Sequence, residues 1–233
     1  MNLSVIARAR NGFSSKFGVP RQVSSSSSLE TRIVFEPAFR VREALRGIEE
    51  CSHLWLIWGF DQVPQPAEEG FGAQGWSPTV RPPRLGGNKR VGVFATRSPY
   101  RPNRLGLTSV RLLRVEETAR EGLVLVVSGA DMQDGTPVFD IKPYLRYADS
   151  HPAANDGIMT HRPPHALRVE WGTDARPADD SLREALTEII AQDPRPAYQD
   201  SPSRRYHFDY DGYAVTFEVS DGTATVVGVD KKV

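Results

Sequence analysis

The feature that most constrains the fold of this chain is a series of short apolar or β-branched runs separated by glycine, proline and asparagine. The runs are Leu54–Phe60, Val91–Thr96, Leu107–Val115 and Leu123–Ser128. Such runs are typical of β-strands, and most connections between them are too short to hold a crossover helix. This favours an antiparallel barrel or sandwich over a doubly wound parallel sheet. One helix is expected in this region, over Pro37–Glu50, where apolar residues recur at helical spacing.

The pattern changes after a proline-rich polar stretch, His151–Pro164, which indicates a linker. Beyond the linker the sequence predicts a strand, a helix and three further strands with Asp-Gly turns between them. The predicted elements are His165–Trp171, Asp180–Ala191, Arg205–Tyr210, Tyr213–Ser220 and Thr223–Val229, with turns at Asp211-Gly212 and Asp221-Gly222. We therefore expect a mainly β chain, with a β-barrel domain over residues 1–160 and a small α+β domain over residues 165–233.

Composition narrows the class of protein. The 233 residues are 39% hydrophobic and 25% charged, which allows a proper core. No apolar run approaches the roughly 20 residues of a membrane-spanning helix, so no membrane association is expected. The single cysteine, Cys51, cannot form an internal disulfide, and no Cys/His cluster has the spacing of a zinc site. These observations predict a cytoplasmic protein without a metal.

Basic residues are segregated, although the net charge is zero. No acid occurs between Glu69 and Glu116. The basic residues in that stretch are Arg81, Arg84, Lys89, Arg90, Arg97, Arg101, Arg104, Arg111 and Arg114. Such a stretch can form a phosphate-binding face for RNA. The pattern is equally consistent with arginines scattered over solvated ends of strands.

One short motif is misleading. A literal G-x-G-x-x-G occurs at Gly70, Gly72 and Gly75. A dinucleotide site needs a strand before this motif and a helix after it, and prolines stand on both sides here. We interpret the motif as a loop.

Two polar clusters are the remaining candidates for chemistry. Arg97–Arg104 is a proline-stiffened loop with three arginines and a tyrosine. Asp134–Tyr144 is a turn followed by alternation, which places Asp140 and Lys142 on the opposite face from Phe139 and Ile141. From the residues alone, this acid and amine are either catalytic or an ion pair on an exposed strand.

Strings of residues spread over nearly the whole chain resemble the TrmO family of tRNA methyltransferases. The matching stretches are Lys16–Gln22, Arg81–Asn88, Val93–Ser98, Arg101–Asn103, Asp134–Tyr144 and Ala191–Tyr198. Long dispersed matches are far more specific than one short motif. The resemblance implies an N-terminal barrel, not a Rossmann sheet, that binds S-adenosylmethionine, and a homodimer whose interface helps to form the active site. It also implies methylation of the exocyclic amino nitrogen of threonylcarbamoyl-adenosine, next to the anticodon of threonine tRNA.

The resemblance carries over to particular residues. It implies cofactor contacts at Pro20, Arg21, Gln22, Asp61, Gln62, Arg97, Leu107, Asp134, Gly135, Thr136 and Pro137. The predicted RNA-binding residues are Arg84, Lys89, Arg90, Arg101, Arg104 and Arg195. Two departures stand out: Asp61 takes the place of a histidine before Gln62, and Arg104-Leu105-Gly106 replaces a more usual proline-isoleucine-glycine.

The expected chemistry suggests which residues are catalytic. The exocyclic amine is a weak nucleophile, so a base that removes its proton helps the transfer. Asp140 is the predicted base, and Lys142 and Tyr144 are predicted to orient it or to hold the threonyl carboxylate. Two other functions stay open: methylation of a small molecule by the same cofactor, and a non-catalytic RNA-binding barrel.

Overall fold

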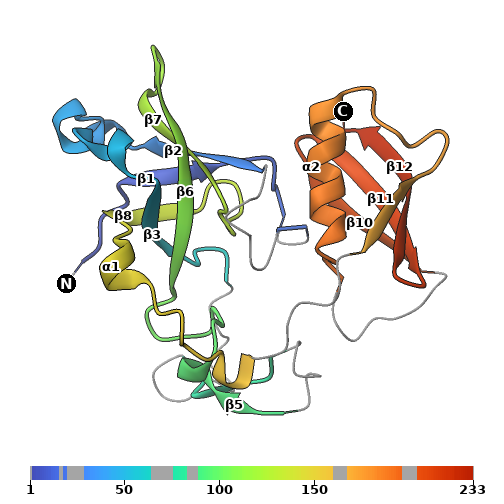
Figure 1. The fold of residues 1–233 in the computed structure, drawn as a ribbon, viewed down its shortest axis with the longest axis horizontal. Helices are drawn as coiled ribbons and strands as arrows, with labels where there is room; N and C mark the ends of the chain where they lie inside the picture. Colours follow the sequence, from blue (N-terminus) through green and yellow to red (C-terminus); the bar gives the residue numbers. More distant parts are fainter. Residues whose placement is uncertain are drawn as a thin grey trace.

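The computed structural model describes residues 2–15, 18–19, 29–63, 76–82, 89–159, 167–195 and 204–232. Among them, six antiparallel strands close into a barrel in the order β1-β2-β7-β6-β3-β8 (Figure 1). The strands are β1 Ala7–Arg10, β2 Glu30–Phe35, β3 His53–Gly59, β6 Leu105–Thr118, β7 Gly122–Ser128 and β8 Pro137–Pro143. The prediction of a mainly β, non-Rossmann fold is confirmed.

Alternating side chains fill the barrel. In β3, Leu54, Leu56 and Trp58 are buried, while the residues between them are only partly covered. Trp58 is paired with Gly106 of β6, where an added Cβ would lie 2.2 Å from the indole ring. Only glycine leaves room there for so large a ring inside the barrel.

The predicted helix over Pro37–Glu50 is wrong. The segment forms three short 3-10 helices, Pro37–Phe39, Arg42–Leu45 and Ile48–Glu50. Extended backbone at Val41 and Arg46 and a left-handed Gly47 (φ 86°) separate them. Leu45 and Ile48 still pack against the barrel core, so their spacing reflects contact with the barrel and not a continuous helix.

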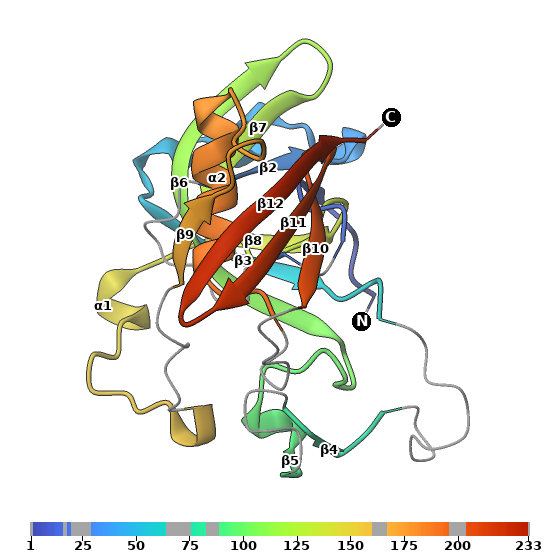
Figure 2. The same ribbon diagram turned by 90° about the vertical axis from the view of Figure 1, so that its right-hand side faces the viewer.

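The predicted strand over Val91–Thr96 is also largely wrong. Only β5, Val91–Gly92, pairs with another strand, and its partner is β4, Thr79–Val80. The chain then turns into a 3-10 helix over Val93–Ala95. Figures 1 and 2 show this two-stranded ribbon below the barrel, clear of the second sheet. A short helix, α1 Arg146–Asp149, precedes the predicted linker. A 3-10 helix, Gly157–Met159, lies within it.

The C-terminal module is a four-stranded sheet with one helix (Figure 2). Its strands have the order β10-β11-β12-β9, with β9 parallel to β12. Their bounds are β9 Arg168–Trp171, β10 Arg205–Tyr210, β11 Tyr213–Ser220 and β12 Thr223–Lys231, and the helix is α2 Asp180–Ala191. The predicted helix, the strands β10 and β11, and both Asp-Gly turns are confirmed.

Local chemistry explains why these elements were predictable. Asp179 caps α2 by accepting hydrogen bonds from the backbone N–H groups of Ser181 and Leu182. Both Asp-Gly turns have positive φ at each central residue, between 48° and 77°, as tight two-residue hairpins require. The buried face of α2 then packs on the sheet through residues such as Leu186 and Ile190.

A short segment, Asn11–Ser14, connects the two modules; we refer to it as the strap. It follows β1 of the barrel, yet Phe13 lies in the hydrophobic core of the C-terminal module. The ring of Phe13 meets the ring of Tyr210 edge-on at 5.0 Å, and the Asp211 N–H donates to the Gly12 carbonyl at 2.8 Å. The C-terminal module therefore holds the chain directly after the first barrel strand.

Candidate active site

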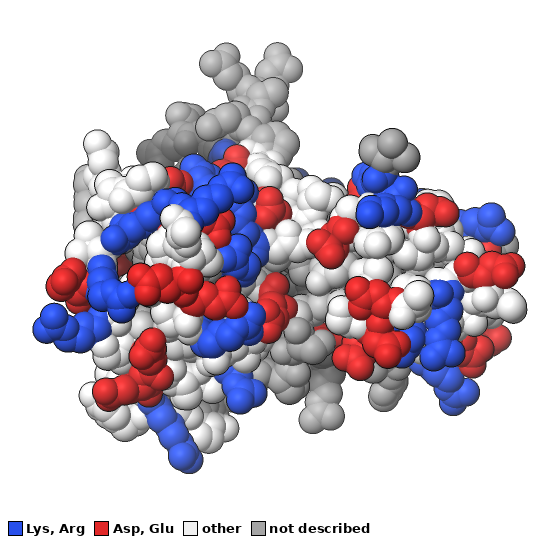
Figure 3. Space-filling view, turned by 90° about the horizontal axis from the view of Figure 1, so that it is seen from above, with Lys and Arg blue, Asp and Glu red and all other residues white. Residues whose placement is uncertain are grey.

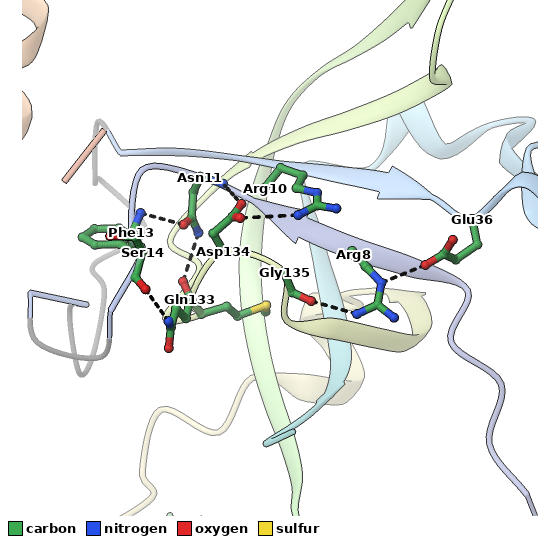
Figure 4. Close-up of polar contacts among 10 residues, drawn as sticks. Arg8, Arg10, Asn11, Phe13, Ser14, Glu36, Gln133, Asp134 and Gly135 are labelled. Atoms are coloured by element: carbon green, nitrogen blue, oxygen red, sulfur yellow. Dashed lines mark hydrogen bonds and ion pairs between the residues drawn. The ribbon is translucent and has the colours of Figure 1, made fainter. Parts of the chain in front are cut away.

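The turn at Asp134–Pro137, predicted to contact the cofactor, lies beneath the strap (Figure 4). The Asp134 carboxylate accepts hydrogen bonds from the Asn11 backbone N–H at 3.1 Å and from Arg10 Nη1 at 3.4 Å. In return, the Asp134 N–H donates to the Phe13 carbonyl at 2.9 Å. The side chain of Gln133 donates to the Ser14 carbonyl at 2.7 Å. One carboxylate oxygen of Asp134 thus holds the turn to the strap, and the other holds it to Arg10 of β1.

Strand β1 holds the same turn from its other side. The Gly135 N–H donates to the Ala9 carbonyl at 2.8 Å, and Arg8 Nη1 donates to the Gly135 carbonyl at 3.1 Å. Glu36 orients Arg8 by accepting from its Nε at 2.9 Å. Gly135 has φ 83°, a left-handed backbone that favours glycine. These contacts give the turn a defined backbone conformation.

A chain of hydrogen bonds connects the barrel interior to Asp131. Trp58 Nε1 donates to Thr108 Oγ1 at 3.0 Å, and Thr108 Oγ1 donates to Asp131 Oδ1 at 2.6 Å. The directions follow from chemistry, because an indole N–H can only donate and leaves the hydroxyl hydrogen for the carboxylate. Burial raises the pKa of Asp131, against the opposing effects of the Thr108 hydrogen bond and the charge of Arg97. The sequence analysis missed Asp131, since a single acid three residues before Asp134 carries no motif.

Strand register brings a predicted cofactor residue and the predicted base to one face of the barrel. Ile57 of β3 is paired with Asp140 of β8 on one side and with Leu107 of β6 on the other. Two strand spacings separate Asp140 from Leu107, which is about 10 Å. The Leu107 side chain is 58% exposed. Lys142 Nζ lies 3.5 Å from Asp140 Oδ2. The predicted shared face of Asp140 and Lys142 is confirmed, and it is the outer face.

A bulge decides which residues of β8 point outward. Between Ile57 and Trp58 the pairing shifts from Asp140 to Val138, so one residue of β8 is extra. Val138 is fully buried and Ile141 packs against the barrel core, whereas Asp140 is partly exposed. Strict alternation would have put Val138 and Asp140 on the same face.

Aromatic contacts surround the end of β8. The ring of Tyr144 lies 5.7 Å from that of Trp55 and 6.1 Å from that of His53. Trp55 Nε1 donates to Asp149 Oδ2 at 3.0 Å. The backbone N–H of Leu145 and the Trp55 indole together lower the pKa of Asp149. Helix α1 therefore closes on β3 and keeps Tyr144 near the outer face that carries Lys142.

The Arg97–Arg104 loop returns to the end of β3. The Phe60 N–H donates to the Arg104 carbonyl at 2.9 Å, and Arg104 Nη1 donates to the Val63 carbonyl at 3.2 Å. These contacts set the loop beside the exposed residues Asp61 and Gln62. Arg104 has φ 47°. A proline could not adopt this backbone conformation, because its ring fixes φ near about −65°.

The other predicted RNA-binding residues lie in different surroundings. Arg90 Nη1 is 3.3 Å from Thr79 Oγ1, on the β4–β5 ribbon, and Lys89 precedes it on exposed chain. Arg101 makes a long hydrogen bond of 3.5 Å to the Thr96 carbonyl. Arg195 is 12% exposed and forms a two-pronged ion pair with Asp193, at 2.7 Å and 2.9 Å.

The acid-free stretch of sequence is not free of acids in space. Arg114 donates to both carboxylate oxygens of Glu30, at 2.6 Å and 2.8 Å, and to Glu116 at 2.8 Å. The Arg114 hydrogen bond lowers the pKa of Glu30. On the face in Figure 3, basic and acidic side chains are intermixed and form no patch of one sign. The sequence pattern therefore overstates the basic surface at the β2–β6 side of the barrel.

Four predicted site residues, Pro20, Arg21, Gln22 and Arg84, lie outside the described residues. Within the part of the chain that the structure describes, no three His, Cys, Asp or Glu side chains are grouped to hold a metal ion. In the same part, no helix has the length and apolarity to cross a bilayer.

The closed barrel, its fixed polar turn and the appended α+β module define a two-module β-barrel protein outside the Rossmann class. Two families match it: the tRNA-methyltransferase O N-terminal domain over residues 8–150 and the TrmO C-terminal domain over residues 165–232. The chain belongs to the TrmO family.

Individual relatives agree with this membership. The chain is 44% identical over 180 residues to a tRNA (adenine(37)-N6)-methyltransferase of Eikenella corrodens, covering 76% of this chain and 96% of that protein. It is 35% identical over 232 residues to the tRNA (adenine(37)-N6)-methyltransferase of Escherichia coli K12, covering 96% and 95%. The crystal structure of TrmO from Pseudomonas aeruginosa superposes with a TM-score of 0.76 at 32% identity, covering 98% of each chain.

Proposed function

We propose that this protein is an S-adenosylmethionine-dependent tRNA methyltransferase that acts on the N6 nitrogen of adenine 37. The observation that carries the proposal is the match to the Escherichia coli enzyme over 96% of this chain, through both modules. We further propose that the adenine is threonylcarbamoylated and belongs to threonine tRNA. The proposed domains are residues 1–160 and 165–233, and the proposed location is the cytoplasm, where tRNA is modified.

The described residues fit the proposed cofactor. When bound, S-adenosylmethionine supplies a methyl group on a sulfonium, and it also presents a carboxylate, an ammonium and an adenosine. The Asp134–Pro137 turn offers a surface of defined shape, because its N–H groups are already held by the carbonyls of Phe13, Ala9 and Gln133. Arg97 offers a cation for a carboxylate, and the half-buried Asp131 offers an anion for a cation. Asp61, Gln62 and Leu107, with Pro20, Arg21 and Gln22, complete the proposed contacts.

Asp140 is the proposed base. With the methyl donor bound, Asp140 would accept the proton that the amino nitrogen loses when it takes the methyl group. Lys142, whose Nζ lies 3.5 Å from Asp140 Oδ2, and Tyr144 are proposed to orient Asp140 or to hold the threonyl carboxylate. With Asp140→Asn, we expect the single-turnover rate to fall about 10²- to 10⁴-fold while the cofactor dissociation constant is unchanged. A normal single-turnover rate would show that Asp140 is not the base.

We also propose a homodimer with a shared active site. Leu107, Phe94 and Tyr147 are large side chains that are 58%, 72% and 88% exposed in the single chain. Asp140 lies on the same outer face as Leu107 and is itself 48% exposed, so a second copy would complete its surroundings. In the proposed dimer, each site takes Asp140 from one protomer and Arg97 from the other. Mixing Asp140→Asn protomers with Arg97→Gln protomers should therefore regenerate one intact site per mixed dimer and part of the activity. No recovery from mixed dimers, or a monomeric mass by light scattering, would contradict the proposal.

For tRNA, we propose contacts from Arg84, Lys89, Arg90, Arg101 and Arg104. Arg195 of the C-terminal module is also proposed, and it would have to leave its ion pair with Asp193 to reach a phosphate. The decisive experiment uses labelled S-adenosylmethionine and total tRNA from cells able or unable to make threonylcarbamoyl-adenosine. We expect label only on the threonylcarbamoylated adenosine. Cofactor binding without transfer to either tRNA would favour a small-molecule methyltransferase, and RNA binding without cofactor binding would favour a non-catalytic barrel.

A further inference from the structure

Asn11 is the first residue of the strap, and its side chain binds three segments of the chain (Figure 4). Asn11 Nδ2 donates to the Met132 carbonyl at 3.0 Å and to Thr31 Oγ1, on β2, at 3.2 Å. Asn11 Oδ1 accepts from the Phe13 N–H at 3.0 Å, which closes a tight turn at the start of the strap. The backbone N–H of the same residue donates to the Asp134 carboxylate at 3.1 Å. The barrel wall, the strap and the segment before β8 therefore meet at one residue.

The carboxamide of Asn11 matches the hydrogen-bonding needs of its partners. The Phe13 N–H can only donate, and the Met132 carbonyl can only accept. A carboxamide supplies an oxygen acceptor for the first and two N–H donors, one for Met132 and one for Thr31. Thr31 and Met132 are both buried, so bulk water does not replace a donor that they lose. An aspartate of the same size would keep the acceptor and lose both donors.

The segment that Asn11 holds depends on such contacts, because no sheet sets its position. The structure describes residues 129–133, between β7 and the Asp134–Pro137 turn, without a helix or strand. Three contacts hold the end of this segment to the strap: Met132 binds Asn11, Gln133 binds Ser14 and Asp134 binds Phe13. Of the three strap residues, Asn11 is the one whose side chain also binds β2. It therefore fixes the segment relative to the barrel wall.

We propose that Asn11 is a positioning residue for the proposed methyl transfer. Its carboxamide sets the position of the segment that leads into the Asp134–Pro137 turn, so it acts on the proposed cofactor site through Met132 and Asp134. The assignment rests on the proposed function and extends it, because it adds a residue that holds the site from behind. Phe13 is buried in the C-terminal core, so the turn closed by Asn11 also links that core to the site.

Calorimetry with S-adenosylhomocysteine, the demethylated cofactor, tests this role. Asn11→Asp keeps the acceptor for the Phe13 N–H and removes both donors, so the affinity should fall about 10- to 100-fold. Asn11→Ser keeps an acceptor and one donor near the same place, so its loss should be smaller, below about 10-fold. In turnover assays, the KM for S-adenosylmethionine should rise in the same order, while the KM for tRNA stays the same.

Two further variants separate positioning from general stability. Val110→Ala is the control, because Val110 is buried in the barrel core on β6 and takes no part in these contacts. It should lower the melting temperature and bind S-adenosylhomocysteine as the wild type does. Thr31→Val removes the hydroxyl that Asn11 binds and nearly keeps the shape of the side chain, so it tests the role even if Asn11→Asp does not fold. Its affinity should fall about 3- to 10-fold.

The possible failures of the two proposals differ. Wild-type affinity in the Asn11 and Thr31 variants, or an equal loss of affinity in Val110→Ala, would overturn the positioning role. A wild-type protein that does not bind S-adenosylhomocysteine would instead overturn the proposed function on which the role rests.

Discussion

The barrel and the C-terminal module bury different kinds of side chain. The buried polar residues among those that the structure describes all belong to the N-terminal part: Thr31, Thr96, Ser128 and Thr136. The core of the C-terminal module is built from aliphatic and aromatic residues, such as Leu186, Ile190 and Phe217. The same module also holds the ion pair between Asp193 and Arg195. Buried polar groups cost stability unless each finds a partner, so a region that keeps several is typical of a binding or catalytic site.

The difference suggests a division of labour between the modules. The barrel carries the polar network around Asp131 and Asp134, and the C-terminal module supplies an apolar seat for the strap that holds this network. The strap is the physical connection, because Phe13 is buried in one module while its carbonyl accepts from Asp134 in the other. The C-terminal module therefore acts on the Asp134 turn through the strap.

The largest effect is expected from truncating Phe13, the strap residue that is buried in the C-terminal core. Phe13→Ala leaves a cavity in the C-terminal core. The free energy of unfolding should fall by about 3–5 kcal/mol, as measured by denaturant titration. Cofactor affinity should fall with it, and hydrogen exchange at the Asp134 and Gly135 amides should accelerate. Phe39→Ala, at a phenylalanine that is 38% exposed, is the control with little expected change. If hydrogen exchange at both amides were unchanged in Phe13→Ala, the C-terminal module would not control the Asp134 turn through the strap.

A smaller effect is expected inside the barrel. In Gly106→Ala the new methyl group collides with the Trp58 ring, and overpacking of this kind costs about 1–3 kcal/mol. Displacement of Trp58 should also disturb Thr108 and Asp131, which lowers affinity for S-adenosylmethionine. Gly92→Ala is the matched control, since a methyl group there meets no atom within 4 Å. Equal melting temperatures for the two variants would refute the tight fit in the barrel.

The smallest expected effect is a loss of folding stability at alkaline pH through Tyr210, whose ring packs against Phe13 of the strap. Burial, with nearby acids, raises the pKa of Tyr210 to about 12 from 10.0. The folded state thus favours the neutral phenol, so this stability is complete below pH 10 and is lost as the pH rises from 10 to about 12. After allowing for the partial exposure of the ring, the loss should be roughly 1–2 kcal/mol. Tyr210→Phe should remove this part of the pH dependence in melting experiments, and an unchanged profile would count against it.

The helices and strands that begin or end at a local sequence signal, such as a capping residue or a tight turn, were predictable from the sequence. The Asp179 cap and the Asp-Gly turns act within a few residues, and α2, β10 and β11 have the predicted bounds. The Pro37–Glu50 segment failed for the opposite reason. Its apolar spacing serves contact with the barrel, and the left-handed Gly47 interrupts any helix.

The same distinction between local and long-range information holds for the candidate site. The sequence by itself determined the residue types, the two-module order and the family, because these follow from composition, turn chemistry and long matching strings. Only the tertiary structure decided which residues meet. The register of β3 and the bulge in β8 put Asp140 and Leu107 on one face, and the closure of the barrel brought Thr108 to Asp131. The reason is physical: strand register and chain crossing depend on contacts between distant segments, which no local pattern of residues encodes.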